Sequence, residues 1–302
     1  MHVQLSTAMK QWGIYDLNRD IDEIGAAVNY IRNTVCQSNP TNVVIMGHST
    51  GCQDVLHYLQ APGKSRPVVQ GAILQAPVSD REGILRECAN NPEVDEHLQK
   101  CLHHISEIPE DKRRKFLLPL DLSIPVMGPT PVNAARFLSL VSPDSPQKPS
   151  LDDLFSSDLS DQRFRETFGK IGSVGMLKSA KDVKPSMLIL CSGADSTVPD
   201  LIDKSKLLSR FKAAIEHSGA AVADEASLVI EGGAHDLSGD SAIARKGRLV
   251  DMRGAVLAYI DRVVGGVSKE SWGVLEEEAV NARDPKDADS TGAQTGVQEL
   301  KL

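Results

Sequence analysis

One stretch of the chain, residues 42–59, limits the fold more than any other, because a strand, a tight turn and a helix follow one another there without a break. The strand is predicted from Asn42-Val43-Val44-Ile45-Met46, a run without polar alternation that is typical of strands buried on both faces of a parallel sheet. The turn is Gly47-His48-Ser49-Thr50-Gly51, and a helical pattern covers residues 52–59. A strand buried on both sides needs helices on both faces of its sheet, so this stretch predicts an α/β fold.

Short apolar runs and helical patterns alternate along the rest of the chain. Apolar residues at three- and four-residue steps predict a helix over residues 17–35, with Asp16 as its N-cap. The alternation implies right-handed crossovers and a doubly wound, mostly parallel sheet. Further strands are predicted at residues 2–5, 71–75, 187–191 and 227–231, and further helices at residues 201–217 and 243–264.

Two regions depart from this alternation. The interval between Ala76 and Met187 is rich in proline and charge, and an unstructured loop of that length would not fit inside a compact domain. We therefore predict a largely helical insertion over about residues 84–182, within one α/β domain that spans residues 1–264. Residues 265–302 are polar and acidic, which predicts a flexible tail.

The turn after the strand of residues 42–46 carries the first candidate catalytic residue, Ser49. The spacing of Gly47, Ser49 and Gly51 is by itself weak evidence for a nucleophile. Its position on a tight strand-to-helix turn is stronger evidence, because such a turn raises the serine hydroxyl above the sheet edge. We expect both glycines to be needed, because neighbouring elements crowd the backbone there. The backbone amide of Thr50, at the start of the helix, is a candidate oxyanion donor. The alternative is a turn whose serine only caps the helix.

A serine nucleophile needs a base and an orienting acid, and in this class of sheet they follow in the order serine, acid, histidine. Asp195 lies in the loop after the strand of residues 187–191, and His235 lies in the glycine-rich loop after the strand of residues 227–231. Each alone has a simpler interpretation, as a helix-capping aspartate and a surface histidine. Together, in the required order after the required strands, they predict a Ser49, His235 and Asp195 triad.

Other motifs are weaker candidates. His48 adjoins Ser49 but is expected to point elsewhere on the turn, as a packing or hydrogen-bonding residue. His103 and His104 lie in the insertion without metal-ligand spacing, and we expect them to be structural or to face substrate. Gly63-Lys64-Ser65 is similar to the end of a phosphate loop, but the required earlier glycine is absent and the segment follows a helix.

Composition excludes several classes of function. Lys and Arg total 33 against 41 Asp and Glu, and the net charge of −8 repels phosphate backbones, so a nucleic-acid partner is not expected. The five cysteines are dispersed without a close pair, which favours reduced thiols over a disulfide framework or a zinc site. We expect no cofactor, no metal and no membrane segment, and a small-molecule ester as the partner; the sequence does not predict the oligomeric state.

Three segments resemble a fungal α/β-hydrolase family that was long catalogued as a domain of unknown function and that includes esterases of fusarinine-type siderophores. The similarity spans about residues 3–264, including the insertion. It implies a serine hydrolase with Ser49, Asp195 and His235 in the catalytic roles; Asp80 and Arg81 match a family motif without a chemical role that we can assign. The segments are Gly47-His48-Ser49-Thr50-Gly51-Cys52-Gln53-Asp54-Val55, Leu74-Gln75-Ala76-Pro77-Val78-Ser79-Asp80-Arg81-Glu82 and Asp153-Leu154-Phe155-Ser156-Ser157-Asp158-Leu159.

The resemblance has one departure, at the N-terminus. Family members begin with a strand and a glycine-rich loop that supplies one oxyanion amide, and residues 2–5 match the segment after both. Losing one such donor costs roughly 3–4 kcal/mol of transition-state stabilisation. Either the sequence is a shortened form, or the strand of residues 2–5 pairs directly with that of residues 42–46. The amide of Thr50 is then the one oxyanion donor that we can name.

The leading hypothesis is an esterase whose insertion forms a lid and sets substrate choice, with a hydroxamate siderophore or a related fungal secondary metabolite as substrate. One alternative is a binding protein derived from a hydrolase and impaired by loss of the oxyanion loop. Another is an acyltransferase that uses the same triad, since water exclusion by the lid decides between transfer and hydrolysis.

The expected location is the cytoplasm, because the chain opens without a basic and apolar leader. The last residues, Leu300-Lys301-Leu302, share only part of a peroxisomal signal, with leucine where a small residue belongs. A peroxisomal location is therefore the less favoured alternative.

Overall fold

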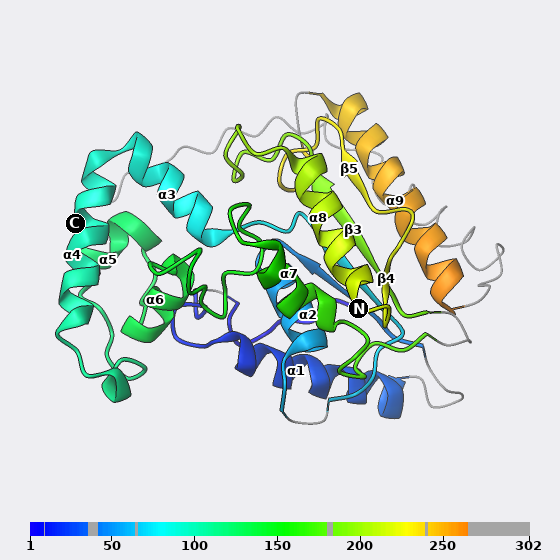
Figure 1. Cartoon of the computed structure of the whole chain (residues 1–302), viewed down its shortest axis with the longest axis horizontal. Helices are drawn as coiled ribbons and strands as arrows, with labels where there is room; N and C mark the ends of the chain where they lie inside the picture. Colours follow the sequence, from blue (N-terminus) through cyan, green and yellow to red (C-terminus); the bar gives the residue numbers. More distant parts are fainter. Residues whose placement is uncertain (9, 36–41, 64–65, 180–183, 239–240, 265–302) are drawn as a thin grey trace, which may run out of the picture. The chain divides into compact units, whose positions relative to one another are not determined.

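A computed structural model describes residues 1–8, 10–35, 42–63, 66–179, 184–238 and 241–264. Its centre is a sheet of parallel strands in the order β1-β2-β3-β4, with β5 also paired to β3 (Figure 1). The doubly wound α/β fold predicted from sequence is confirmed. The described strands are β1 (Val44–His48), β2 (Gly71–Gln75), β3 (Ser186–Ser192), β4 (Val222–Ala223) and β5 (Leu228–Ile230).

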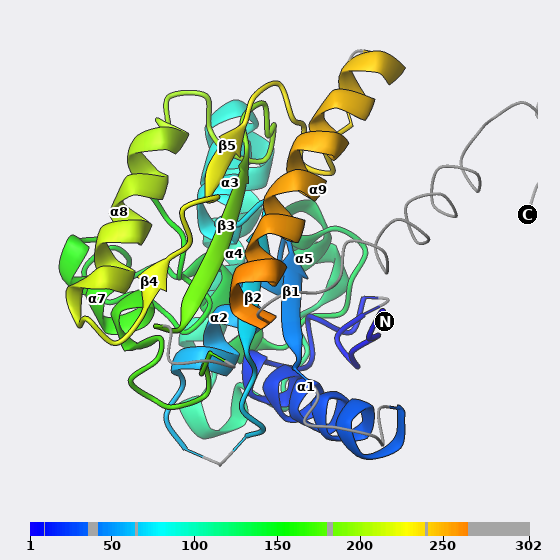
Figure 2. The same cartoon turned by 90° about the vertical axis from the view of Figure 1, so that its right-hand side faces the viewer.

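Helices cover both faces of this sheet, as a strand buried on both sides requires (Figures 1 and 2). Alternate side chains of β3 enter different cores, since successive residues of a strand point to opposite faces. Leu188 and Leu190 pack with Tyr259, and Met187 and Ile189 pack in the core on the other face. The helices are α9 (Ala242–Val264) on one face and α1 (Leu17–Tyr30), α2 (Gly51–Gln60) and α8 (Lys204–His217) on the other.

The insertion contains several helices (Figure 1). It has a core of its own, around Phe137 and Leu98. Its last helix is different, because Phe164 packs with Phe211 of α8 in the main core, with ring centroids 5.1 Å apart. The helices between β2 and β3 are α3 (Asp80–Asn90), α4 (Pro92–Ser106), α5 (Leu120–Met127), α6 (Ala134–Val141) and α7 (Asp161–Thr167), with short 3-10 turns at Glu110–Lys112 and Phe168–Lys170.

The predicted strand at residues 2–5 is wrong. These residues form no strand, and β1 pairs only with β2 among the described strands, so direct pairing of residues 2–5 with β1 is also wrong. The reason lies in the next residues, which are held by α1 instead: the Ser6 amide donates to Glu23 at 2.7 Å and Thr7 Oγ1 donates to Asp20 at 2.8 Å. An extended segment of four residues forms ladder hydrogen bonds only when it lies beside another strand. The contacts of Ser6 and Thr7 instead hold the neighbouring residues 2–5 near α1.

The other predicted helices and strands differ less from the observed ones. Asp16 is the N-cap of α1 as predicted, but the α-helix ends at Tyr30 and continues as a π-helix over Ile31–Val35. The short strand β4 was not predicted, because two residues carry no detectable alternation. The predicted tail, residues 265–302, lies outside the described residues. No helix in the part of the chain that the structure describes has both the length and the apolar character needed to cross a membrane.

Candidate active site

Ser49 lies on a strained turn between β1 and α2. Its backbone has φ of +56°, a conformation that costs free energy for a residue with a side chain. The turn is tight, since a Cβ on Gly47 would lie 2.0 Å from the carbonyl oxygen of Gly51. The expectation for the second glycine is wrong, because a Cβ on Gly51 would have nothing within 4 Å. The first glycine alone is therefore sterically required.

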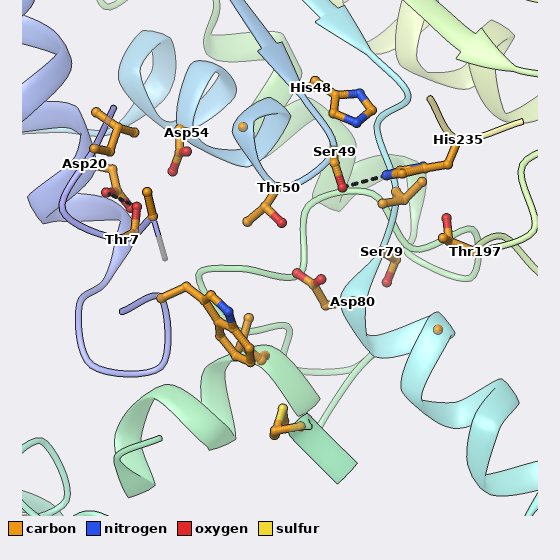
Figure 3. A pocket seen from close by; sticks show the side chains of 18 of the residues that line it. Thr7, Asp20, His48, Ser49, Thr50, Asp54, Ser79, Asp80, Thr197 and His235 are labelled. Atoms are coloured by element: carbon orange, nitrogen blue, oxygen red, sulfur yellow. Dashed lines mark hydrogen bonds between the residues drawn. The ribbon is translucent and has the colours of Figure 1, made fainter. Parts of the chain in front are cut away.

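The structure brings together the three side chains that the sequence analysis selected. Ser49 Oγ donates to His235 Nε2 at 2.7 Å (Figure 3). His235 Nδ1 donates to Asp195 Oδ2, also at 2.7 Å. Asp195 follows β3, and His235 follows β5, which pairs with β3, so both loops leave the same edge of the sheet. Thr197 fixes the acid from the other side, because its amide and hydroxyl both donate to Asp195 Oδ1, at 2.9 and 2.6 Å.

The electrostatics of this chain of hydrogen bonds favour an ionised acid next to a basic imidazole. The hydrogen bond to Asp195 raises the pKa of His235 above its ordinary value, and burial opposes this only in part. Burial pushes the pKa of Asp195 up, but hydrogen bonds from His235 and Thr197 outweigh it, so that this pKa is lowered. Asp195 therefore carries a negative charge that stabilises a protonated His235.

Thr50, the predicted oxyanion donor, is the N-cap residue of α2 and lies beside Ser49 at the cavity (Figure 3). Its backbone amide is thus at the positive end of the helix dipole, where a developing negative charge is stabilised.

His48 does not point away from the catalytic groups as the sequence analysis expected. Its ring lies 4.9 Å from that of His235, and its Nδ1 donates to Gln75 Oε1. Gln75 Nε2 in turn donates to Ser192 Oγ at 3.3 Å and to the carbonyl oxygen of His235 at 3.5 Å. Sequence reasoning missed Gln75, although a buried polar residue at the end of an apolar strand was a usable signal.

Ser49 and His235 open onto a cavity of about 740 Å³ (Figure 3). Residues 2–5 line it in place of forming a strand, and Val126 and Met127 of α5 contribute from the insertion. His103 and His104 are not among the lining residues: His103 is exposed, and the ring of His104 packs 5.6 Å from that of Phe116. Among the described residues, no group of histidine, cysteine and carboxylate side chains has the arrangement of a metal site.

Asp80 and Arg81, in the first turn of α3, contact α2 and a later segment of the insertion. Gln53 Nε2 donates to Asp80 Oδ2 at 2.7 Å. The buried Arg81 forms an ion pair with Asp153 at 2.9 Å and a second one with Asp158. Two of the segments that carry the family resemblance thus contact each other, which gives Arg81 a structural role.

The arrangement is suited to acyl transfer to and from a serine. A histidine within hydrogen-bond reach can take the serine proton, and a buried carboxylate fixes the tautomer of that histidine.

Comparison with known proteins identifies a family and several relatives. The family described as "Protein of unknown function (DUF1749)" matches residues 1–261. The fusarinine C esterase sidJ of Aspergillus fumigatus is 38% identical over 86% of this chain and 79% of its own length. An esterase of Emericella nidulans is 35% identical over 82% of this chain and 74% of its own length.

A solved structure has the same fold. The siderophore hydrolase EstB from Aspergillus fumigatus aligns with a TM-score of 0.71 and 36% identity, over 87% of this chain and 81% of the EstB chain.

Proposed function

The chain belongs to the DUF1749 family, and we propose that it is a serine esterase in which Ser49, His235 and Asp195 act as the catalytic triad. The observation that carries this proposal is the continuous pair of 2.7 Å hydrogen bonds from Ser49 through His235 to Asp195, at the edge of a large cavity. The esterase names of the relatives support the reaction class.

In the first half of the reaction, Ser49 Oγ forms a bond to the ester carbonyl carbon while its proton moves to His235 Nε2. The amide of Thr50 donates to the oxyanion of the tetrahedral intermediate. As the intermediate collapses, the C–O bond to the alcohol breaks and His235 gives its proton to the departing oxygen. Water then repeats the sequence on the acyl-enzyme: His235 takes its proton, the acid is released, and Ser49 regains its hydrogen.

For the substrate, we propose an ester of a siderophore of the fusarinine type or of a related fungal metabolite. The names of two relatives support this class, since one is a fusarinine C esterase and the other a siderophore hydrolase. The cavity beside Ser49, at about 740 Å³, is in the range of sites that enclose a drug-sized ligand.

A fluorophosphonate probe tests the nucleophile directly, because it reacts with activated serines. We expect the wild-type protein to be labelled on Ser49 and the Ser49→Ala variant to remain unlabelled. The matched control is Ser79→Ala, which removes another serine that lines the cavity and should be labelled as wild type is. A folded wild-type protein without label, or equal labelling of Ser49→Ala, would contradict the proposal.

Turnover is tested separately with p-nitrophenyl esters and with fusarinine C. We expect release of the free acid in water. Binding without turnover would favour a binding protein, and an acyl product on an added alcohol, without free acid, would favour an acyltransferase.

A further inference from the structure

A second group of polar side chains lines the cavity apart from the triad. Asp54 projects from α2 into the cavity, and Asp20 of α1 lies next to it (Figure 3). Both are buried, with Asp54 only 7% exposed and Asp20 2% exposed. The proposed reaction uses neither carboxyl group.

One oxygen of this pair, Asp54 Oδ1, lacks a hydrogen-bond donor. The two carboxyl groups hydrogen-bond to each other, which two carboxylates can do only if they share a proton. Thr7 Oγ1 donates to Asp20 Oδ1 at 2.8 Å, whereas Asp54 Oδ1 is buried without a hydrogen-bond partner. A buried acceptor without a donor is costly, and at a cavity wall a bound molecule can supply that donor.

The neighbouring cation is already engaged elsewhere. Arg136 of α6 also lines the cavity, but its Nε donates to the carbonyl oxygen of Trp12 at 2.8 Å and it forms an ion pair with Asp152. Its positive charge lowers the pKa of both Asp54 and Asp20. Among the described residues, Asp54 and Asp20 do not belong to any group of three or more histidine, cysteine or carboxylate side chains that could hold a metal ion.

We propose that Asp54, together with Asp20, forms a subsite for a protonated amino group of the substrate, so that the enzyme prefers esters that carry an ammonium group. An ammonium group has three N–H donors and a positive charge, and it satisfies Asp54 Oδ1 and Asp20 at once. This inference rests on the proposed esterase function, because it names the part of the substrate that this cavity selects.

The protonation of the pair makes the preference dependent on pH. Burial first, and the neighbouring Asp20 second, raise the pKa of Asp54 to about 8, while Arg136 opposes the shift and Asp152 adds to it. Binding of an ammonium group therefore releases the shared proton. The preference for amines should grow between about pH 6 and about pH 8.5, where an alkylamine with a pKa near 10.4 is still protonated.

The test compares p-nitrophenyl 6-aminohexanoate with its N-acetylated form, which has the same ester and no charge. In wild type at about pH 8.5 we expect kcat/KM to be about tenfold or more higher for the amine, as for a buried charge pair. Asp54→Asn should bring this ratio to about one. The matched control is Glu87→Gln, which removes an exposed carboxylate from the same cavity and should preserve the ratio. A wild-type ratio near one, or an unchanged ratio in Asp54→Asn, overturns the proposal.

A binding experiment separates this inference from the esterase proposal. In Ser49→Ala protein, which cannot form an acyl-enzyme, n-hexylammonium should raise the thermal unfolding midpoint at about pH 8.5, whereas hexan-1-ol should not. The added substitution Asp54→Asn should abolish the effect. Equal effects of the two compounds would show an apolar or neutral hydrogen-bonding site, and would overturn the ammonium subsite even if Ser49 is the nucleophile. An ammonium-specific effect would support the subsite even if Ser49 fails to react with fluorophosphonate.

Discussion

The imidazole rings of His48 and His235 lie 4.9 Å apart at the cavity, tilted by 47°, and a single glutamine contacts both residues. Gln75 accepts a hydrogen bond from the His48 ring and donates one to the backbone carbonyl of His235. Gln75 is thus a positioning residue, which acts on the reaction through the loop that carries His235.

Gln75→Leu should lower kcat by about fivefold, because one net hydrogen bond is worth about 1 kcal/mol. KM should change little, since Gln75 does not line the cavity. Steady-state kinetics on a p-nitrophenyl ester would measure both constants. Ser192→Ala is the control, because it removes one partner of Gln75 and leaves the contacts to both histidines. Equal losses in the two variants would argue against a positioning role.

Asp195→Asn should lower kcat by roughly 10⁴-fold, because an amide stabilises neither the required tautomer nor the protonated imidazole. It should also change the pH profile. The reaction needs neutral His235, whose pKa the hydrogen bond to Asp195 raises, so wild-type activity falls as the pH drops through that raised value. Without the carboxylate, the acid limb of kcat/KM should move to lower pH. An acid limb at the wild-type position would exclude His235 as the titrating base.

Local signals predicted much of the fold and the positions of the three catalytic candidates. The strand at Gly71–Gln75 was predicted to the residue, because it is an apolar run between turn-forming segments. Asp195 and His235 could be selected because each follows a strand of the same parallel sheet, which places their loops at one edge.

What sequence reasoning missed depends on contacts between distant elements. Residues 2–5 have a strand-like pattern, but the contacts of Ser6 with Glu23 decide their path. Asp20 and Asp54 each occupy a polar position in a helical pattern, and only the packing of α1 against α2 makes them neighbours. A single pattern cannot show that two carboxyl groups share one buried site.

The two glycines of the turn should respond differently to alanine. Gly47→Ala should destabilise the protein by about 3 kcal/mol or more, because the new Cβ overlaps the Gly51 carbonyl oxygen and the backbone must move. Gly51→Ala meets nothing and lies in the first turn of α2, so it should be neutral or stabilising by up to about 1 kcal/mol. Urea unfolding of the two variants is the measurement. Similar losses in both would contradict the geometry of the turn.

The ion pair of Arg81 with Asp153 should contribute more to stability than that with Asp158. Arg81→Met leaves Asp153 buried without its cation, which should cost about 3–5 kcal/mol of unfolding free energy. Asp158 is half-exposed, so Asp158→Asn should cost at most about 1 kcal/mol. Chemical denaturation at neutral pH distinguishes the two. Equal effects of the two substitutions would contradict the larger contribution of the buried pair.

The buried pair of Asp54 and Asp20 should make the folded state less stable as the pH rises. In the folded chain Asp54 keeps its proton up to a pKa of about 8, whereas in the unfolded chain its pKa is 3.8. Between these values the native state binds more protons, so the unfolding free energy falls with pH, by up to about 1.4 kcal/mol per pH unit from this group. The contribution is fully present below pH 3.8 and lost as the pH rises through about 8.

Asp54→Asn removes this dependence and keeps a donor for Asp20, so its unfolding free energy relative to wild type should increase steadily from about pH 5 to about pH 8. Asp195, whose pKa is lowered, has the opposite effect on stability, but it is present in both proteins and cancels in the difference. Urea unfolding at several pH values measures this difference, with Glu87→Gln as the control for loss of an exposed carboxylate. A difference that is constant with pH would mean that Asp54 is ionised in the empty cavity, and the preference for amines should then be independent of pH as well.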